Sequence, residues 1–227
     1  MYDNASVINT VRHRFFCRKC QGISAVFFFY AFNSCFALQS VTLPASLTTI
    51  KEGAFDNCKS LPSITLPAGI TTIEAYVFCF CSTLLTVDLP ATLTTIGENA
   101  FSECTSLQSL SLPASVTTIE NYAFNSCTAL PSITIPASVT SIGYGAFYFC
   151  HGVKSVTLLG NACQNAIGEY AFHSIGFDTL ATLILPDNWT GHKPDGHGYW
   201  YGGHFSYSDT PTALINADIN AGANKIT

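Results

Sequence analysis

The chain has 227 residues, of which 48% are hydrophobic and 10% charged, and its formal net charge is -5. This composition indicates an ordered chain with a continuous core. The longest apolar run, residues 25–32, is much shorter than the ~18 residues that a membrane-spanning helix needs, so we expect no membrane span.

The charge distribution argues against nucleic acid as a partner. Between residues 32 and 186 the chain has three lysines, no arginine and nine acidic residues. Binding to a phosphate backbone requires clustered Lys and Arg side chains. We therefore expect no nucleic-acid interface on this part of the chain.

The sequence divides into an irregular N-terminal segment (1–24), a repeat array (25–186) and a Gly- and aromatic-rich C-terminal cap or tail (187–227). Residues 1–9 lack the basic start and long apolar stretch of a signal peptide. Cys17 and Cys20 form a Cys-x-x-Cys motif that would suit half of a zinc site or a redox pair. No second ligand pair stands nearby at the usual spacing and no βαβ pattern supports a redox domain, so we interpret them as two cysteines of an irregular chain end.

A phenylalanine recurs through the array with a fixed period. Six of these residues are 23 apart and a seventh follows after a two-residue slip, at Phe32, Phe55, Phe78, Phe101, Phe124, Phe147 and Phe172. A fixed period of this size is typical of a solenoid, in which each repeat is one coil stacked on the coil before it.

Each repeat contains two apolar segments and one turn. The first segment, as in Leu61, Ile64 and Leu66, places three side chains inward with the alternation of a strand. A proline follows at once and ends the strand, because it has no amide donor. The second pair, as in Val116 and Ile119, predicts a short or bent extended segment on another side of the coil. A tight turn of up to one helical turn is expected before each core Phe.

These features together resemble the BspA type of leucine-rich repeat, found in bacterial and protist surface proteins. The matching features are the Ala-Phe pairs, the Cys three residues later, the Leu-x-x-Ile-x-Leu-Pro block and the Ile-Gly or Ile-Glu step, over about two thirds of the chain. The resemblance implies a repeat solenoid of the α/β horseshoe class: a right-handed superhelix of about seven 23-residue repeats, with mostly short strands and single helical turns. The better-known leucine-rich repeat carries a buried Asn/Cys ladder after its strand. That position holds Ser46, Gly69, Thr92, Ser115 and Ser138 here.

A different ladder of cysteines follows the core phenylalanines. It consists of Cys35, Cys58, Cys81, Cys104, Cys127 and Cys150, with Ile175 in the last copy. Neighbouring coils are close enough for disulfides, but equivalent Cβ atoms point in parallel, and a bridge would pinch the stack. We therefore predict buried free thiols that pack as small hydrophobic side chains. Cys79 and Cys163 lie off this ladder.

The outward positions of the main strands and a C-terminal aromatic cluster are the candidate binding surface. The strand face is small, hydroxyl-rich and nearly uncharged, whereas aromatic side chains usually dominate binding energy. We interpret the C-terminal cluster as lying outside the periodic core positions, where it either closes the last coil or anchors a partner. The predicted binding residues are Gln39, Thr42, Thr65, Asp88, Gln108, Thr134, Lys154, Trp189, Tyr199, Trp200 and Tyr201.

Histidines and carboxylates in the C-terminal part raise the question of an enzyme. The candidates are His192, His197 and His204 with Asp187 and Asp195. Their spacings match no zinc motif, and no nucleophile elbow or phosphate-binding loop is present. We therefore expect no catalytic residue, no metal site and no cofactor.

The family resemblance implies a non-enzymatic protein-binding or adhesion solenoid of a cell-surface or secreted protein. It further implies a host matrix or cell-surface protein as the partner, and we expect a monomer. One alternative is a structural stalk or spacer that presents another domain. A more distant alternative is ice or polysaccharide binding by regular threonine rows, formed by Thr48, Thr49, Thr71, Thr72, Thr94, Thr95, Thr117 and Thr118.

Overall fold

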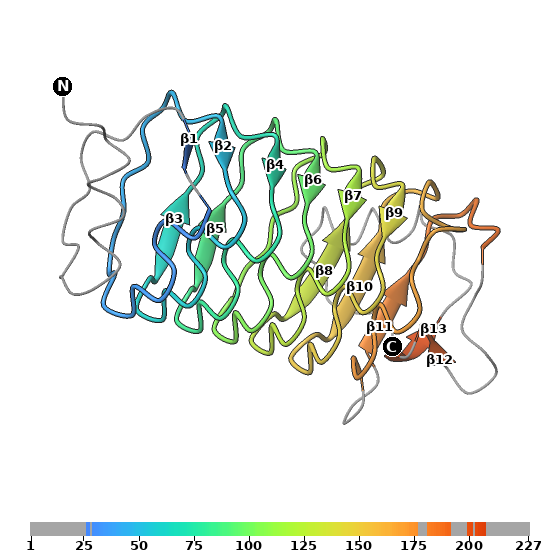
Figure 1. Ribbon diagram of the computed structural model, residues 1–227. Coiled ribbons are helices and arrows are strands. Elements are labelled where there is room, and N and C mark those ends of the chain that lie inside the picture. Colours follow the sequence, from blue (N-terminus) through green and yellow to red (C-terminus); the bar gives the residue numbers. More distant parts are fainter. Residues whose placement is uncertain (1–25, 28, 177–180, 192–198, 202, 208–227) are drawn as a thin grey trace, which may run out of the picture.

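The computed structural model describes residues 26–27, 29–176, 181–191, 199–201 and 203–207. These residues form thirteen β-strands and no helix. The chain winds into coils stacked along one axis, with the first strands at one end and the last strands at the other (Figure 1). We number the coils one to seven by the core phenylalanines, from Phe32 to Phe172. The predicted solenoid is thus confirmed.

The second apolar pair of each repeat builds the longer continuous sheet. Six two-residue strands pair in parallel in the order β1-β2-β4-β6-β7-β9, and an isolated bridge between Ile142 and Ile167 adds the seventh coil. Equivalent threonines are in register, as Thr72 with Thr95. The strands are β1 (Val26–Phe27), β2 (Thr49–Ile50), β4 (Thr72–Ile73), β6 (Thr95–Ile96), β7 (Thr118–Ile119) and β9 (Ser141–Ile142).

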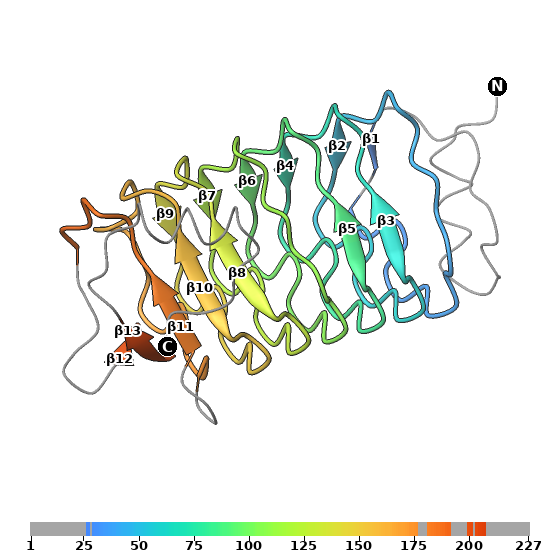
Figure 2. The same ribbon diagram turned by 180° about the vertical axis from the view of Figure 1, so that it is seen from behind.

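The Leu-x-x-Ile-x-Leu segments form two separate sheets on another side of the coils (Figure 2). A two-stranded sheet pairs β3 (Ser63–Thr65) with β5 (Thr86–Asp88). A five-stranded sheet has the order β12-β13-β11-β10-β8, in which β12 alone is antiparallel. Its strands are β8 (Ser132–Ile135), β10 (Ser155–Leu158), β11 (Ala181–Ile184), β12 (Tyr199–Trp200) and β13 (Gly203–Tyr207).

These segments therefore do not form one continuous sheet, because coils one and four have no strand there. In coil four the segment is Gln108-Ser-Leu-Ser-Leu112, without a β-branched residue. The strands of coils five and six carry Ile, Val and Thr instead, which fit the pleated surface better. Leu110 and Leu112 are half-buried, as are Val87 and Leu89 in coil three.

The core phenylalanines form one column of parallel rings. Successive rings from Phe32 to Phe172 stack with centroids 5.1 to 5.6 Å apart and planes within 16° of parallel. The inward apolar residues of both segments surround this column. The core is therefore continuous from the first coil to the seventh, even where the outer sheets are interrupted.

Tight turns with left-handed residues, rather than the expected single helical turns, carry each phenylalanine into the core. In every coil the residues two before and two after the core Phe have positive φ. In coil three these are Tyr76 (φ 58°) and Phe80 (φ 56°). Two left-handed residues so close together interrupt a right-handed helical turn. The turns of successive coils bond to one another, as when the Phe78 amide donates to the Ala100 carbonyl at 2.8 Å.

The cysteine ladder lies beside the phenylalanine column, and each thiol donates to the coil before it. The Cys58 Sγ donates to the Phe32 carbonyl at 3.2 Å, and the Cys104 Sγ to the Phe78 carbonyl at 3.1 Å. Cys81, Cys127 and Cys150 repeat the contact. All these thiols are free and buried, whereas Cys35 in the first coil is half-buried. The predicted free thiols are present, and they act as hydrogen-bond donors as well as hydrophobic filling.

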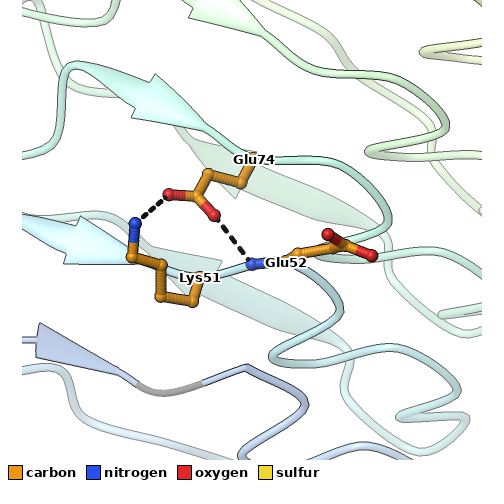
Figure 3. Close-up of polar contacts among 3 residues, drawn as sticks. All are labelled: Lys51, Glu52 and Glu74. Carbon is orange, nitrogen blue, oxygen red and sulfur yellow. Dashed lines mark hydrogen bonds and ion pairs between the residues drawn. The ribbon is translucent and has the colours of Figure 1, made fainter.

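Carboxylates satisfy backbone amides between coils at the edge of the turns (Figure 3). Glu74 accepts from the Lys51 Nζ at 2.7 Å and from the Glu52 amide at 3.0 Å. Glu120 accepts from the Glu98 amide at 3.0 Å in the same way, two coils further along. The acid four residues before a core Phe thus holds the turn of the preceding coil.

Candidate functional site

The predicted strand-face residues all lie on the outside of the solenoid. Thr65, Asp88 and Thr134 are exposed on β3, β5 and β8, and Lys154 is exposed directly before β10. Gln39, Thr42 and Gln108 are also exposed, but they lie in the segments of coils one and four that form no strand. The structure therefore places these seven residues along one side of the stack, although they do not share one sheet.

The strand face offers hydrogen-bonding groups with little charge. The Thr65 hydroxyl donates to the Asp88 carboxylate at 2.7 Å across β3 and β5, so one of the face's two charged groups already has an internal partner. Leu85, which is 39% exposed, is a large hydrophobic side chain on the described part of this face. Such a surface can form many weak polar contacts with a partner, but it lacks aromatic anchors.

The threonine rows lie beside and within the six-stranded sheet, on a different side from the strand face (Figure 1). The first row bonds to the backbone: the Thr94, Thr117 and Thr140 hydroxyls donate to the carbonyl of the equivalent residue one coil earlier, at 3.0 to 3.2 Å. The second row, which includes Thr72 and Thr95, is half-buried. Several hydroxyl groups of these rows therefore already donate hydrogen bonds within the solenoid.

Two residues of the predicted C-terminal cluster belong to the end of the core. Trp189 is 6% exposed, and its amide donates to the Pro186 carbonyl at 3.0 Å. The Val116 amide makes the same contact with Pro113, so Trp189 occupies a periodic core position of coil seven, contrary to our interpretation from the sequence. Tyr201 packs partly buried against the core, and its carbonyl accepts from the Phe172 amide at 3.1 Å.

The other aromatic residues of that cluster give less information about a binding role. Tyr199 and Trp200 form β12, whose backbone pairs with β13 at the end of the five-stranded sheet. Their side chains lie outside the described residues. His192, His197 and Asp195 also lie outside the described residues. In the described part of the chain, no group of three or more His, Cys, Asp or Glu side chains could hold a metal ion.

A second aromatic cluster, which sequence analysis missed, covers the turns of coils five to seven. Tyr144, Phe149 and Tyr170 are exposed by 38 to 39%. Neighbouring rings contact edge to face or stacked, with centroids 4.2 to 6.3 Å apart. We call this the turn-face aromatic cluster, and it consists of Tyr122, Tyr144, Tyr148, Phe149, Tyr170 and His173.

The period itself contains the signal for this cluster. Their positions are counted from the core Phe of each coil, in three consecutive coils. Tyr144 lies three residues before it, Tyr122 and Tyr170 two before, Tyr148 and His173 one after, and Phe149 two after. Residues at equivalent positions in stacked coils are neighbours, so scattered aromatics in the sequence become one surface patch. Partial desolvation, then the neighbouring Tyr122 and Glu169, raise the pKa of the Tyr144 hydroxyl above its ordinary value. The cluster thus combines exposed rings with nearby carboxylates.

The buried thiols are poor candidates for nucleophilic chemistry. Burial raises the pKa of the Cys81 and Cys150 thiols to about 12, and that of Cys104 well above its ordinary value. A thiolate, not a thiol, is the reactive species. Cys79, off the ladder, is also buried with a pKa raised to about 12, mainly by desolvation. Cys17 and Cys20 lie outside the described residues.

Comparison with known proteins places this geometry in a family. A family model described as BspA type leucine rich repeat region matches in 6 copies, over residues 27–154 and 71–192. A search of the curated proteins finds no match. Within the described residues, no helix is long and apolar enough to cross a membrane.

Several solved structures share the fold. A leucine-rich repeat protein from Bacteroides ovatus is 23% identical with a TM-score of 0.60, over 74% of this chain and 50% of its own length. A T. pallidum leucine rich repeat protein is 31% identical with a TM-score of 0.58, over 66% of this chain and 69% of its own. The pneumococcal vaccine antigen PcpA is 18% identical with a TM-score of 0.54, over 83% of this chain and 56% of its own length.

This chain therefore spans half the length of the Bacteroides ovatus protein. The family match extends over most of the coils described above, from residue 27 to residue 192. The repeating Phe column and Cys ladder give that match a physical basis, since each repeat contributes one ring and one small buried side chain to the core. The chain belongs to the BspA-type leucine-rich repeat family.

Proposed function

We propose that the chain is a non-enzymatic binding solenoid of a cell-surface or secreted protein, and that its strand face contacts a protein partner. The observation that carries the proposal is the exposure of all seven predicted strand-face residues along one side of the stacked coils. A row of stacked coils presents an extended surface, and repeat proteins commonly bind through such surfaces. The proposed partner is a matrix or cell-surface protein of a host.

The surface location is part of the same proposal. It is supported by membership in the BspA-type family and by the structural similarity to PcpA, a pneumococcal vaccine antigen. Labelling intact source cells with an antibody against this chain tests it. Signal on intact cells supports the location, whereas signal that appears only after permeabilisation contradicts it.

Adhesion can be tested with beads coated with the whole chain. The probes are plates coated with collagen, laminin, fibronectin or fibrinogen, and a layer of cultured epithelial cells. Gln108→Glu with Thr134→Glu changes the strand face, and both side chains are exposed. Thr71→Glu with Thr140→Glu adds the same two negative charges at exposed positions on the side of the six-stranded sheet and is the matched control.

We expect the unmodified chain to retain beads on at least one probe. The strand-face variant should weaken retention by about tenfold, the effect of losing roughly 1.4 kcal/mol at an interface. The control variant should behave like the unmodified chain. No retention on any probe, or equal loss in both variants, contradicts the proposal.

A structural spacer is the second candidate, and the continuous phenylalanine column favours it. Ring stacking without a gap from coil one to coil seven makes a stiff rod that can hold another domain away from a surface. The low aromatic content of the strand face agrees with this role. A chain that retains no beads yet positions a fused domain at a fixed distance would support the spacer.

A further inference from the structure

The turn-face aromatic cluster lies apart from the strand face and has its own chemistry. Its exposed members Tyr144, Phe149 and Tyr170 rest on half-buried Tyr122, Tyr148 and His173. Tyr148 stacks on His173 at 4.6 Å between centroids, which holds the floor of the cluster in place. Rings held in this way lose little conformational freedom when a partner covers them.

At the other end of the solenoid, exposed rings on the turn side already carry cations from this chain. The Lys51 Nζ lies 5.8 Å from the centroid of the Phe29 ring. The Lys59 Nζ lies 5.7 Å from the centroid of the Phe36 ring. Both distances are within the ~6 Å range of a cation–π interaction. In coils one and two, therefore, aromatic residues of the turn side pair with lysines of the next coil.

The same ring positions in coil six also hold aromatic side chains, but coil seven supplies no lysine to cover them. Tyr144 and His151 are the equivalents of Phe29 and Phe36, while Gly168 and Gly176 stand where Lys51 and Lys59 would be. A Cβ atom on Gly168 would lie 2.4 Å from the Tyr144 amide nitrogen, so the backbone leaves no room for a side chain. Coil six therefore presents aromatic rings on the turn side, and coil seven provides no lysine side chain to pair with them.

The charge around the cluster favours a cation from outside. From residue 60 to residue 153 the chain has no Lys or Arg, and it has four glutamates on or beside the turns, at Glu74, Glu98, Glu103 and Glu120. Glu169 adds an exposed carboxylate next to Tyr170, close enough to Tyr144 to contribute to its raised pKa. Among the described residues beyond Lys59, Lys154 is the remaining Lys or Arg, and it lies on the strand face.

We propose that the turn-face aromatic cluster docks an arginine- or lysine-rich segment of a partner polypeptide. Cationic side chains would lie over the rings of Tyr144, Phe149 and Tyr170 and close to Glu169. Aromatic faces attract cations, most strongly guanidinium groups, and the carboxylates add a charge attraction that salt screens. The proposal does not rest on the strand face, because the two surfaces have different residues and different charge.

The repeat supplies variants that keep the turn geometry. Phe149 (φ 57°) stands where other coils have Ser34 and Ser126, so Phe149→Ser installs a residue that this turn already accepts. Tyr170→Asn copies Asn99 in the same way. The matched controls are Phe80→Ser and Tyr76→Asn in coil three, which change the same repeat positions, 46% and 37% exposed, outside the cluster.

The test measures binding of a fluorescent octa-arginine peptide to the whole chain by fluorescence anisotropy. We expect saturable binding that weakens with added salt, no binding of octa-glutamate, and no binding of a neutral oligosaccharide such as maltohexaose. The double variant Phe149→Ser/Tyr170→Asn should weaken binding by about tenfold, since each exposed cation–π contact contributes a few-fold. The double variant Phe80→Ser/Tyr76→Asn should stay within about twofold.

Three results would overturn the proposal. The first is no saturable binding of octa-arginine at low salt. The second is equal weakening in both double variants, which would assign the binding to net charge alone. The third is competition by the neutral oligosaccharide, which would identify a carbohydrate surface. Bead retention that depends on Gln108 and Thr134 would be unaffected by any of these results, so the two proposals can fail separately.

Discussion

Each ladder cysteine both fills the core and joins two coils. The Cys127 Sγ donates to the Phe101 carbonyl at 3.3 Å, and that carbonyl also accepts the Cys104 amide at 3.2 Å. The thiol therefore satisfies a second lone pair of a buried carbonyl, which a methyl group would leave without a donor. Ile175 in the last coil fills the equivalent space without this hydrogen bond.

The raised thiol pKa values predict a loss of stability in alkali. The folded chain keeps these thiols neutral up to a pKa of about 12 for Cys81 and Cys150, whereas the thiols of the unfolded chain ionise near 9.0. Between these values the unfolded state binds fewer protons, so the stabilisation present below pH 9 is lost as the pH rises toward 12. Each such thiol contributes a slope of about 1.4 kcal/mol per pH unit.

Urea unfolding from pH 8 to pH 11 measures this effect. Tyrosines also ionise in this range, so the informative comparison is with Cys104→Ala, which removes one buried thiol whose pKa lies well above its ordinary value. The variant should be less stable at pH 8, with a shallower decline above pH 9. An identical slope in the two proteins would mean that Cys104 is not held neutral in the folded chain.

The phenylalanine column predicts a large cost for removing one ring. Phe101 is 1% exposed and stacks between Phe78 and Phe124 at 5.2 Å on each side. Phe101→Ala should lower the free energy of unfolding by about 3 to 5 kcal/mol, because the neighbouring coils cannot close the cavity. Thr134→Ala, on the exposed face of β8, should change it by ~0.5 kcal/mol or less. Comparable losses in urea melts would show that the inside and outside of the coil are wrongly assigned.

At the scale of elements, the two apolar segments of the repeat behave differently from what their lengths suggest. The longer segment, with its strand-like alternation, forms sheets interrupted at coil four, whereas the two-residue Thr-Ile segment pairs without a break from β1 to β9. The sequence predicts both segments and their inward residues, because the period of 23 repeats them. It does not predict continuity, because pairing also depends on how the adjacent coil fits.

The turns show a similar limit. Gly53, Gly145, Asn57 and Asn99 mark positions where a left-handed residue is easily accepted. The same positions hold Tyr76 and Phe80, which have no such preference. Their conformation is imposed by hydrogen bonds between coils, so it follows from the stack rather than from the local residues.

The interruption at coil four predicts a local difference in hydrogen exchange. Within the described chain, the amides of residues 109–112 donate no backbone hydrogen bond, whereas β10 is paired on both sides by β8 and β11. Peptides covering 109–112 should therefore exchange earlier than peptides covering Ser155–Leu158. Equal protection of the two segments, measured by mass spectrometry, would contradict an interrupted sheet.

At the scale of the whole molecule, one core column carries several distinct surfaces. The repeat could be used to predict which strand positions face outward, and all seven of them are exposed. The repeat does not predict the packing at the last coil or on the turns. Trp189 is a core residue of the last coil, and the turn-face aromatic cluster forms from residues of three coils. These features depend on contacts between repeats, so they become visible only when the coils are stacked in register.

Thiol labelling followed by mass spectrometry tests this stacked column most directly, because coils two to six each contribute one buried ladder cysteine. A thiol reagent applied to the native chain should leave Cys58, Cys81, Cys104, Cys127 and Cys150 unmodified. Denaturation without a reductant should then expose all five to labelling, since they are free and buried. Labelling of any of them in the native chain at the rate of an exposed thiol, or failure to label after denaturation, would contradict a continuous core of stacked coils with unpaired thiols.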